Sequence, residues 1–249
     1  MLRNQHLILM FDRHDFFISE ELKIRVHAVK ILIIGCGMGS QVAHLLVRSG
    51  FSHLTLCDGD VFETTNKNRQ FCDDNSLNNN KAMETAKNLF LINKDCQINV
   101  IDRFLKEHEL EREIEKHDYI INTIDFDSID FLLCSDFCRK YQKKEIFPIN
   151  LGFDGCVCFF NQKNETFSSF FQERDVIELK SKIINYLIIS QGSEETKTFF
   201  KKYTDNKPKN DPQTGISTFL NASIVCRIIL KDLNNEEVKL FPQFYYLGL

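Results

Sequence analysis

The feature that most constrains the fold is a regular alternation of short apolar runs and segments of helical spacing between residues 30 and 160. The first apolar run, 30–34, is uninterrupted and stops at Gly35, which is typical of a strand buried on both faces. Strands and helices at this cadence predict an α/β fold with a Rossmann-like, doubly wound and largely parallel sheet. Further strands are expected at 53–57, 97–101, 118–123, 146–150 and 156–160, and helices at 40–49, 81–92, 107–116 and 128–142.

The ends of the chain give weaker patterns. We expect an N-terminal helical segment over 1–30, an α/β core over 31–160 and, over 161–249, a C-terminal part of the same domain. The C-terminal part is expected to hold mixed polar helices over 161–211 with a mobile stretch around 201–212, a helix over 216–233 and a final strand over 238–247.

Composition narrows the function classes. The 249 residues carry a formal net charge of −4, which argues against a surface built to bind nucleic acid. No stretch approaches 18 apolar residues, so no membrane-spanning segment is expected. The apolar run 7–11 is followed at once by charged residues without a small-residue cleavage site, which makes it a poor signal peptide. We therefore expect a cytoplasmic protein.

Nine cysteines are spread along the chain, an odd number with no C-x-x-C spacing. These features argue against a disulfide framework and against a structural zinc site with paired ligands. Cys134 and Cys138 fall about one helical turn apart, and Cys156 and Cys158 share one face of a predicted strand. All four are interpreted as small buried hydrophobic residues.

A glycine turn, Gly35-Cys36-Gly37-Met38-Gly39-Ser40, follows the first predicted strand and opens the next helix. Glycines let backbone amides approach a phosphate or ribose closely, and the helix N-terminus adds partial positive charge. The turn is one residue shorter than G-x-G-x-x-G, and it also resembles the first motif of S-adenosylmethionine methyltransferases. Asp58, at the end of the second strand, would hold ribose hydroxyls in methyltransferases, dehydrogenases and other nucleotide-binding enzymes alike.

The polar string 58–70 separates these classes. It places Arg69 just past a strand end, where neither dehydrogenases nor methyltransferases need an arginine. A guanidinium matches phosphate oxygens in a fork, and Lys81 at the start of the next helix adds a second cation. Asp125, past the fourth strand, offers a hard oxygen ligand for Mg²⁺. Because the carboxyl ends of parallel strands meet at one edge, this set favours a site for a nucleoside triphosphate with Mg²⁺.

This series of residues resembles the ThiF/MoeB/HesA superfamily, whose fold also underlies ubiquitin-activating enzymes. The resemblance covers about residues 13–160 and is greatest to short bacterial ThiF-type proteins. It implies the ThiF/MoeB fold, with extra antiparallel C-terminal strands, and an ATP- and Mg²⁺-dependent adenylyltransferase that activates a carboxylate. The residues that carry it are the glycine turn, Asp58-Gly59-Asp60-Val61, Asn66, Arg69-Gln70, Lys81 and Ile124-Asp125-Phe126.

The resemblance also implies a role for each matching residue, and it makes 31–160 the nucleotide-binding core. Asp125 would coordinate Mg²⁺ and forms the candidate catalytic set with Arg69, Lys81 and Arg13. Arg13, upstream of the first strand, would reach the nucleotide phosphates, often across a dimer interface. Arg69 and Lys81 would also bind the nucleotide, together with Gly35, Gly37, Gly39, Asp58, Asp60, Asn66 and Phe126, with Asp58 on the ribose and Asn66 on the phosphates.

Two departures from the family pattern bear on activity. Phe126 stands where many members have Asn, which changes the contacts expected near the adenine or metal. No cysteine lies between Phe159 and Val225, although thioester-forming relatives carry their catalytic thiol in this part of the chain. The chemistry would then end at an acyl-adenylate without an enzyme thioester. Both departures also leave a non-catalytic ThiF-fold subunit, binding nucleotide or a protein partner, as the alternative.

The expected partners follow from the same resemblance. A homodimer is expected, with a small protein or peptide C-terminus as the activated carboxylate. Nucleic acid is not expected, although a tRNA-bound carboxylate stays open because one class of relatives acts on tRNA. The basic groups at 139–144 and 201–209 are interpreted as solvated faces, and the Phe-rich segment 167–171 as core rather than a docking site.

Overall fold

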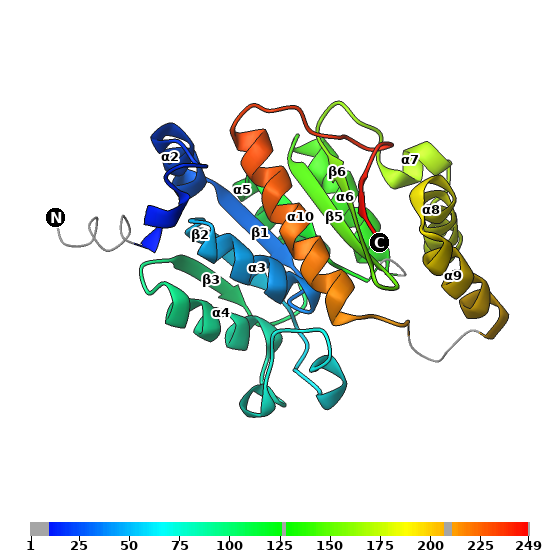
Figure 1. Ribbon diagram of the computed structural model, residues 1–249, viewed down its shortest axis with the longest axis horizontal. Coiled ribbons are helices and arrows are strands. Elements are labelled where there is room, and N and C mark those ends of the chain that lie inside the picture. Colours follow the sequence, from blue (N-terminus) through cyan, green and yellow to red (C-terminus); the bar gives the residue numbers. More distant parts are fainter. Residues whose placement is uncertain (1–9, 126–127, 207–210, 249) are drawn as a thin grey trace.

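A seven-stranded sheet between two layers of helices forms the centre of the computed structural model, which describes residues 10–125, 128–206 and 211–248 (Figure 1). In spatial order the strands are β3, β2, β1, β4, β5, β6 and β7. The first five along the chain pair in parallel, whereas β6 and β7 pair antiparallel, as expected. The strands are β1 Lys30–Ile34, β2 His53–Cys57, β3 Gln97–Ile101, β4 Tyr119–Asn122, β5 Lys144–Leu151, β6 Asp154–Phe160 and β7 Tyr245–Leu247.

Helices connect the parallel strands and cover both faces of the sheet. Among the described residues, none of them is both long enough and apolar enough to cross a bilayer. Their bounds are α2 Glu20–Ala28, α3 Met38–Arg48, α4 Lys81–Ile92, α5 Glu107–Lys116, α6 Ile129–Lys140, α7 Phe167–Phe171, α8 Val176–Gln191, α9 Glu194–Asn206 and α10 Gly215–Leu233, with short 3-10 turns at η1 Asp12–His14, η2 Thr64–Asn66 and η3 Asp74–Ser76.

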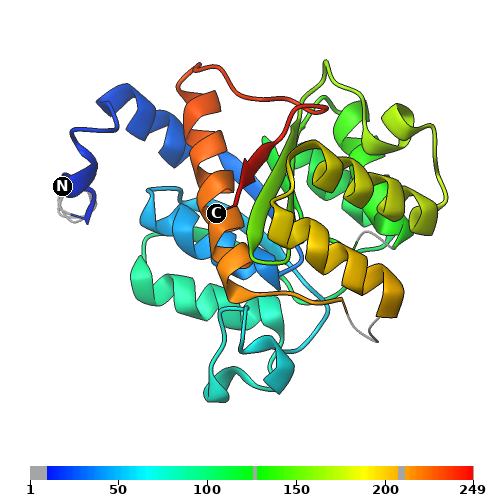
Figure 2. The ribbon, with the colours of Figure 1, turned by 45° about the vertical axis from the view of Figure 1, so that its right-hand side comes forward.

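Alternation along the buried strands divides the core between the two faces. Ile31 and Ile33 of β1 belong to the hydrophobic cluster that includes α2, α3, α4 and α10, whereas Leu32 and Ile34 belong to the cluster with α5 and α6. Helices α7, α8 and α9 form a separate group beside the β6 and β7 end of the sheet (Figure 2). Phe167 of α7 is buried in the aromatic cluster there, as its interpretation as core required.

The switch in strand order lies between β1 and β4, which are neighbours although β2 and β3 separate them in sequence. In open α/β sheets, ligands bind beside such a switch, outside the carboxyl ends of the strands. Gly35, Asp58 and Thr123 directly follow β1, β2 and β4. The topology therefore brings the glycine turn, the polar string and the segment leading to Asp125 to one edge of the sheet.

Two expectations need correction, and a third stays a prediction. Helix α3 begins at Met38, two residues earlier than expected, because Gly37 already serves as its N-cap. The final strand is limited to β7, because Pro242 has no N–H to donate and only residues 245–247 pair with β6. The stretch expected to be mobile begins inside α9, and 207–210 lie outside the described residues.

Candidate functional site

The glycine turn fits closely against the end of β4. Gly35 has φ +94° and donates its N–H to the Cys57 carbonyl at 2.8 Å. A Cβ on Gly35 would lie 2.6 Å from Thr123 Oγ1 and 2.7 Å from the Thr123 carbonyl oxygen. Both the left-handed backbone of Gly35 and its short distance to Thr123 require glycine at this position.

Gly37 leaves the first turn of α3 without a side-chain cap. It is the N-cap of α3 and supplies no side-chain cap, so the first N–H groups of the helix depend on other partners. A Cβ at Gly37 would lie 2.9 Å from the Gln70 amide nitrogen, which places the polar string directly beside the turn. The positive end of α3 thus lies next to the polar loop.

Asp58 ties the end of β2 to the glycine turn. Its Oδ2 accepts the Cys36 backbone N–H at 2.6 Å, and its Oδ1 accepts the Asp60 N–H at 2.8 Å. Burial raises the pKa of the Asp58 carboxyl, while these two hydrogen bonds and the charge of Lys81 act in the opposite direction. The carboxylate that the family resemblance assigns to the ribose is therefore fixed against the glycine turn.

Lys81 reaches the same edge from the start of α4. Its backbone N–H donates to the Asp60 carbonyl at 2.9 Å, and its Nζ lies 3.3 Å from Asp60 Oδ2. The Asn80 amide donates to the carbonyls of Asp58 and Asp60, which joins the helix start to the polar string. The Lys81 side chain is only 12% exposed, so its charge is held next to the two aspartates.

Arg69 is held by several acceptors of the chain itself. Its Nε donates to Gln213 Oε1 at 2.8 Å, and its Nη1 donates to the Thr65 carbonyl at 2.9 Å and to Asn68 Oδ1 at 3.0 Å. Burial lowers the pKa of Arg69, and the negative charge of Asp125 raises it. Arg69 and Asp125, 56 residues apart in sequence, therefore lie within electrostatic reach of each other.

Asn66 points into its own loop. It is buried, and its Oδ1 accepts the Glu63 N–H at 2.9 Å in a reciprocal cap of η2. In this arrangement the side chain holds the shape of the loop that carries Arg69. A contact of Asn66 with phosphate stays a prediction.

Asp125 follows β4 at the carboxyl edge and is exposed. Its carbonyl accepts the Ser128 N–H at 2.9 Å, just before α6. In the described part of the chain, no three His, Cys, Asp or Glu side chains group into a site that could hold a metal ion. A Mg²⁺ that accompanies a nucleotide takes one or two carboxylates and otherwise phosphates and water, so one exposed carboxylate fits that ion. Phe126, predicted to bind nucleotide, lies outside the described residues.

Arg13 is the one described candidate that lies away from this edge. It is exposed in η1, and the neighbouring Phe11 ring lies 3.8 Å from the position that a Cβ on Gly50 would take. Gly50 precedes β2 and therefore marks the amino edge of the sheet. The structure does not bring Arg13 to the other candidates within one chain.

Two residues of this region are not among the candidates from the sequence. Thr123 donates Oγ1–H to the carbonyls of Ile34 and Gly35, which fixes the close approach of β4 to the glycine turn. As the polar residue that directly follows a buried strand, it could have been identified from its position. Gln213 is 144 residues from Arg69, and nothing in its local sequence indicates that contact.

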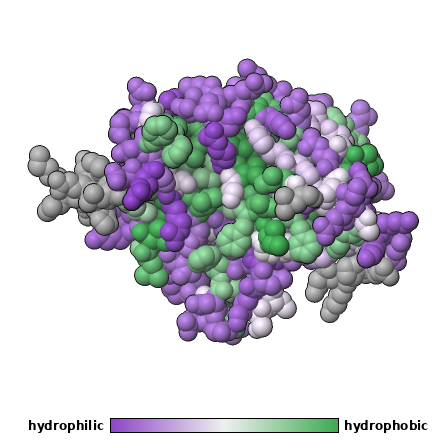
Figure 3. Space-filling model, in the orientation of Figure 1, coloured by the Kyte–Doolittle hydropathy of each residue, from purple (hydrophilic) through white to green (hydrophobic). Residues whose placement is uncertain are grey.

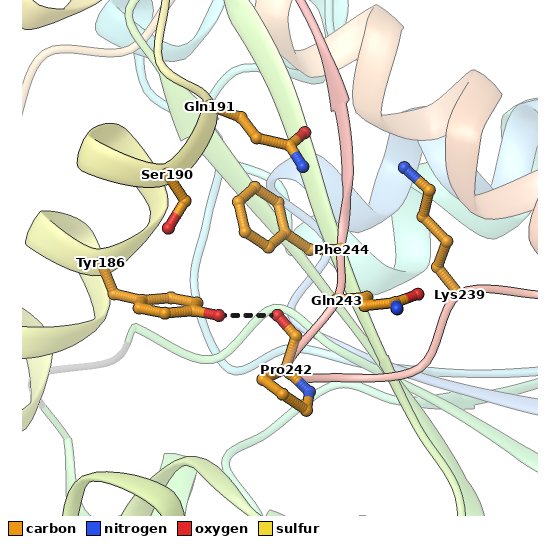
Figure 4. Close-up of a pocket in the computed structure, with 7 residues that line it drawn as sticks. All are labelled: Tyr186, Ser190, Gln191, Lys239, Pro242, Gln243 and Phe244. Carbon is orange, nitrogen blue, oxygen red and sulfur yellow. Dashed lines mark hydrogen bonds between the residues drawn. The ribbon is translucent and has the colours of Figure 1, made fainter.

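Two surface hollows lie elsewhere, and neither includes a predicted site residue. One, of about 440 Å³, lies between α8 and the tail before β7 and is lined by Tyr186, Lys239 and Phe244 among others (Figure 4). The other, of about 500 Å³, lies at α6 and α7 and includes Arg139 and Arg174. All nine cysteines are free, and all except Cys72 are buried.

Comparison with known proteins identifies the family. The model of the ThiF family matches residues 11–246. A probable molybdopterin-synthase adenylyltransferase of Gracilaria tenuistipitata var. liui is 29% identical over 147 residues, which cover 56% of this chain and 40% of that relative. The tRNA threonylcarbamoyladenosine dehydratase of Haemophilus influenzae is 36% identical over 104 residues, which cover 41% of this chain and 40% of that relative. The chain thus matches about 40% of the length of these curated relatives.

Solved structures show the same fold. The E. coli tRNA N6-threonylcarbamoyladenosine dehydratase TcdA matches with a TM-score of 0.66 at 18% identity, covering 92% of this chain and 95% of that one. The complex of E. coli MccB with AMPCPP and MccA matches with a TM-score of 0.63 at 17% identity, covering 86% of this chain and 58% of that one. With the family model spanning nearly all of the described residues, the chain belongs to the ThiF family.

Proposed function

We propose that this protein is an ATP- and Mg²⁺-dependent adenylyltransferase that activates a carboxylate as an acyl-adenylate. The observation that carries the proposal is the arrangement of the glycine turn, Asp58, Lys81 and Asp125 at the carboxyl edge of the sheet, where the charge of Asp125 also raises the pKa of Arg69. A phosphate-binding cation beside a hard oxygen ligand suits the triphosphate tail of ATP with its metal ion. Relatives named as adenylyltransferases support the same reaction class.

In the proposed complex, the glycine turn and the start of α3 approach the nucleotide. Asp58 would accept hydrogen bonds from the ribose hydroxyls, and Asp60 would set the position of Lys81 through the contact already formed. Lys81 and Arg69 would neutralise the phosphates. Asp125 would hold Mg²⁺, which would supply further positive charge beside the phosphates.

The chemistry requires no general base, because a carboxylate is already ionised at neutral pH. One carboxylate oxygen attacks the α-phosphorus, and an oxygen–phosphorus bond forms there. The bond from the α-phosphorus to the bridging oxygen breaks, and its electrons leave with pyrophosphate. Arg69 and Lys81 contribute by holding the phosphates in line and offsetting their charge.

We infer that the reaction passes through no enzyme thioester. The chain has no cysteine between residues 159 and 225, where thioester-forming relatives carry theirs. Burial raises the pKa of the Cys36 thiol and raises that of Cys57 to about 12, so the thiols beside the glycine turn are poor nucleophiles. The acyl-adenylate would react directly with an external acceptor.

The proposed substrate is the C-terminal carboxylate of a small protein or peptide. MccB, which shares the fold, has been crystallised with MccA and an ATP analogue. A tRNA-bound carboxylate is the competing substrate, since TcdA and a curated relative are named for a modified tRNA. The net charge of −4 favours the protein or peptide substrate.

The proposed assembly is a homodimer in which Arg13 acts on the partner's site. Arg13 lies at the opposite edge of the sheet from its own Arg69, so a phosphate contact requires a second copy. Apolar side chains gather on the outer surface around α10 (Figure 3), where Ile216 and Phe219 are 58% and 56% exposed. An exposed apolar surface of this kind suits an isologous contact between copies.

Pyrophosphate–ATP exchange tests the proposal. Labelled pyrophosphate should enter ATP only when Mg²⁺ and the correct carboxylate are present, and Arg69→Ala should abolish the exchange. Arg48→Ala, at the exposed end of α3, is the matched control and should leave it unchanged. Candidate substrates are small proteins with free C-termini, short peptides, amino acids and tRNA. ATP binding without exchange on any of them would instead support a non-catalytic subunit.

Mixing two inactive variants tests the dimer. Arg13→Ala and Asp125→Ala chains are each expected to be inactive alone. Mixed, they should recover up to about a quarter of the wild-type exchange rate, because random exchange gives half heterodimers and each contains one intact site. No recovery from mixed chains that have been shown to exchange subunits would contradict a contribution of Arg13 across the interface.

A further inference from the structure

The hydrogen bond between Arg69 and Gln213 joins the polar loop after β2 to the segment just before α10. An arginine offers five N–H donors on three nitrogens. The acceptors of the chain engage two of these nitrogens, Nε through Gln213 and Nη1 through Thr65 and Asn68. Among the described residues no hydrogen bond engages Nη2, so one nitrogen with two donors is left for a ligand.

Gln213 is itself held in place. It lies in residues 211–215, here called the strap, which lead into α10. Thr214, next to Gln213, donates its Oγ1–H to the Gly152 carbonyl at 2.8 Å and caps α10 by accepting the Ser217 N–H. A Cβ on Gly215 would lie 2.7 Å from the Asn68 carbonyl oxygen, so the strap runs directly against the loop that carries Arg69.

The other end of the strap is attached to the helices beside β6 and β7. Asp211 accepts hydrogen bonds from Lys180 Nζ of α8 at 2.7 Å and from the Tyr203 hydroxyl of α9 at 2.5 Å. These two helices lie side by side in both ribbon views (Figures 1 and 2). One short segment therefore links α8 and α9 to the guanidinium at the carboxyl edge.

We propose that Gln213 is a positioning residue that holds Arg69 by its Nε and so directs Nη2 toward the phosphates of ATP. The inference rests on the proposed function, because the ligand of Nη2 is the triphosphate. A glutamine suits this task since its Oε1 accepts one N–H without adding negative charge beside the phosphates. Through the strap, the position of the Arg69 side chain also depends on the contacts that Asp211 makes with α8 and α9.

The test compares the affinities for Mg-ATP and for adenosine, measured by equilibrium dialysis on the full chain. Gln213→Met keeps the length of the side chain and removes the acceptor. It should weaken Mg-ATP binding about tenfold, the effect of losing one hydrogen bond to a charged group, and leave adenosine binding within about twofold. Gln191→Met, the same change at an exposed position at the end of α8, should alter neither affinity.

A double-mutant cycle separates a positioning role from a general loss of structure. In the Arg69→Ala background, Gln213→Met should have no further effect on Mg-ATP binding, because its target is gone. Asp211→Asn should weaken Mg-ATP binding two- to threefold in the wild-type background only. Equal losses for ATP and adenosine, or the same loss with and without Arg69, would overturn the inference. A wild-type chain that does not bind Mg-ATP would overturn the proposed function itself, and this inference with it.

Discussion

The Asp58 carboxylate accepts the backbone N–H of Cys36 at 2.6 Å, which joins the end of β2 to the glycine turn after β1. The same carboxylate accepts the Asp60 N–H at 2.8 Å. One buried side chain therefore holds both segments that approach the proposed nucleotide. Its removal should change stability as well as binding.

Asp58→Ala should lower the free energy of unfolding by about 3 kcal/mol, because the buried Cys36 N–H and the partly buried Asp60 N–H both lose a charged acceptor. Asp60→Ala is the matched control: its side chain is 58% exposed, and the expected loss is below about 0.5 kcal/mol. Urea unfolding at neutral pH measures both. Equal losses for the two variants would show that the Asp58 contacts add nothing to the fold.

Lys81→Ala should weaken Mg-ATP binding by roughly 10- to 100-fold, since it removes a charge-assisted contact to phosphate. Lys87→Ala, on the same helix but with a 63% exposed side chain, should leave the affinity unchanged. Calorimetric titration of both variants with Mg-ATP measures the two affinities. If Lys87→Ala weakened Mg-ATP binding as much as Lys81→Ala does, the effect would not depend on where the lysine lies.

Gly35→Ala should cost several times more stability than Gly152→Ala. Both glycines have positive φ, at +94° and +67°, so both variants pay the roughly 1 kcal/mol cost of a left-handed alanine. Only at Gly35 does the added Cβ also approach a backbone oxygen to 2.7 Å; at Gly152 the nearest atom is 3.8 Å away. The difference between the midpoints of thermal unfolding of the two variants measures the cost of the short contact between the added Cβ and the Thr123 carbonyl oxygen. Equal midpoints would show that this contact costs nothing.

Glu145 gives a pH-dependent prediction. It is buried in β5, where its Oε1 accepts from the Asn122 amide at 2.7 Å and from the Ser135 hydroxyl at 2.8 Å. Burial raises the pKa of its carboxyl from 4.5 to about 7, and the two hydrogen bonds lower it. Between these two values the folded chain keeps a proton that the unfolded chain has released. This group therefore makes stability fall as pH rises, by about 1.4 kcal/mol per pH unit, until the curve flattens above the folded pKa.

Glu145→Gln removes this titration and keeps an acceptor for both donors. Its free energy of unfolding, relative to the wild type, should increase as pH rises from 4.5 to 7. Glu115→Gln, an exposed position on α5, should show no such trend. Urea unfolding across this pH range provides the measurement, and parallel curves for Glu145→Gln and the wild type would contradict the prediction.

The strands and helices of the parallel core could be predicted almost to the residue. Continuous apolar runs such as 30–34 leave one interpretation, and helices such as α4 and α5 have clear apolar spacing. The final strand could be predicted less well, because Pro242 interrupts the segment 238–247, whose apolar content suggests a longer strand. The short α7 and the polar α9 depend on contacts with distant parts of the chain rather than on their own pattern.

The candidate site could be predicted where its residues follow directly on strand ends. Gly35, Asp58 and Asp125 meet because parallel strands end at one edge, which the alternation of strands and helices already implies. The Gln213 contact could not, since only the folded path of α10 brings residue 213 to Arg69. The location of Arg13 at the far edge depends on where the N-terminal segment packs, for which its short sequence gives no indication.

Calorimetric titration with Mg-ATP is the direct test of nucleotide binding at the carboxyl edge of the sheet. We expect one site per chain for ATP in the presence of Mg²⁺, and we expect binding to be lost in an Arg69→Ala, Lys81→Ala double variant that keeps its fold by circular dichroism. S-Adenosylmethionine and NAD should give no heat of binding under the same conditions. Wild-type protein that binds either of these ligands and not Mg-ATP would contradict the proposed function.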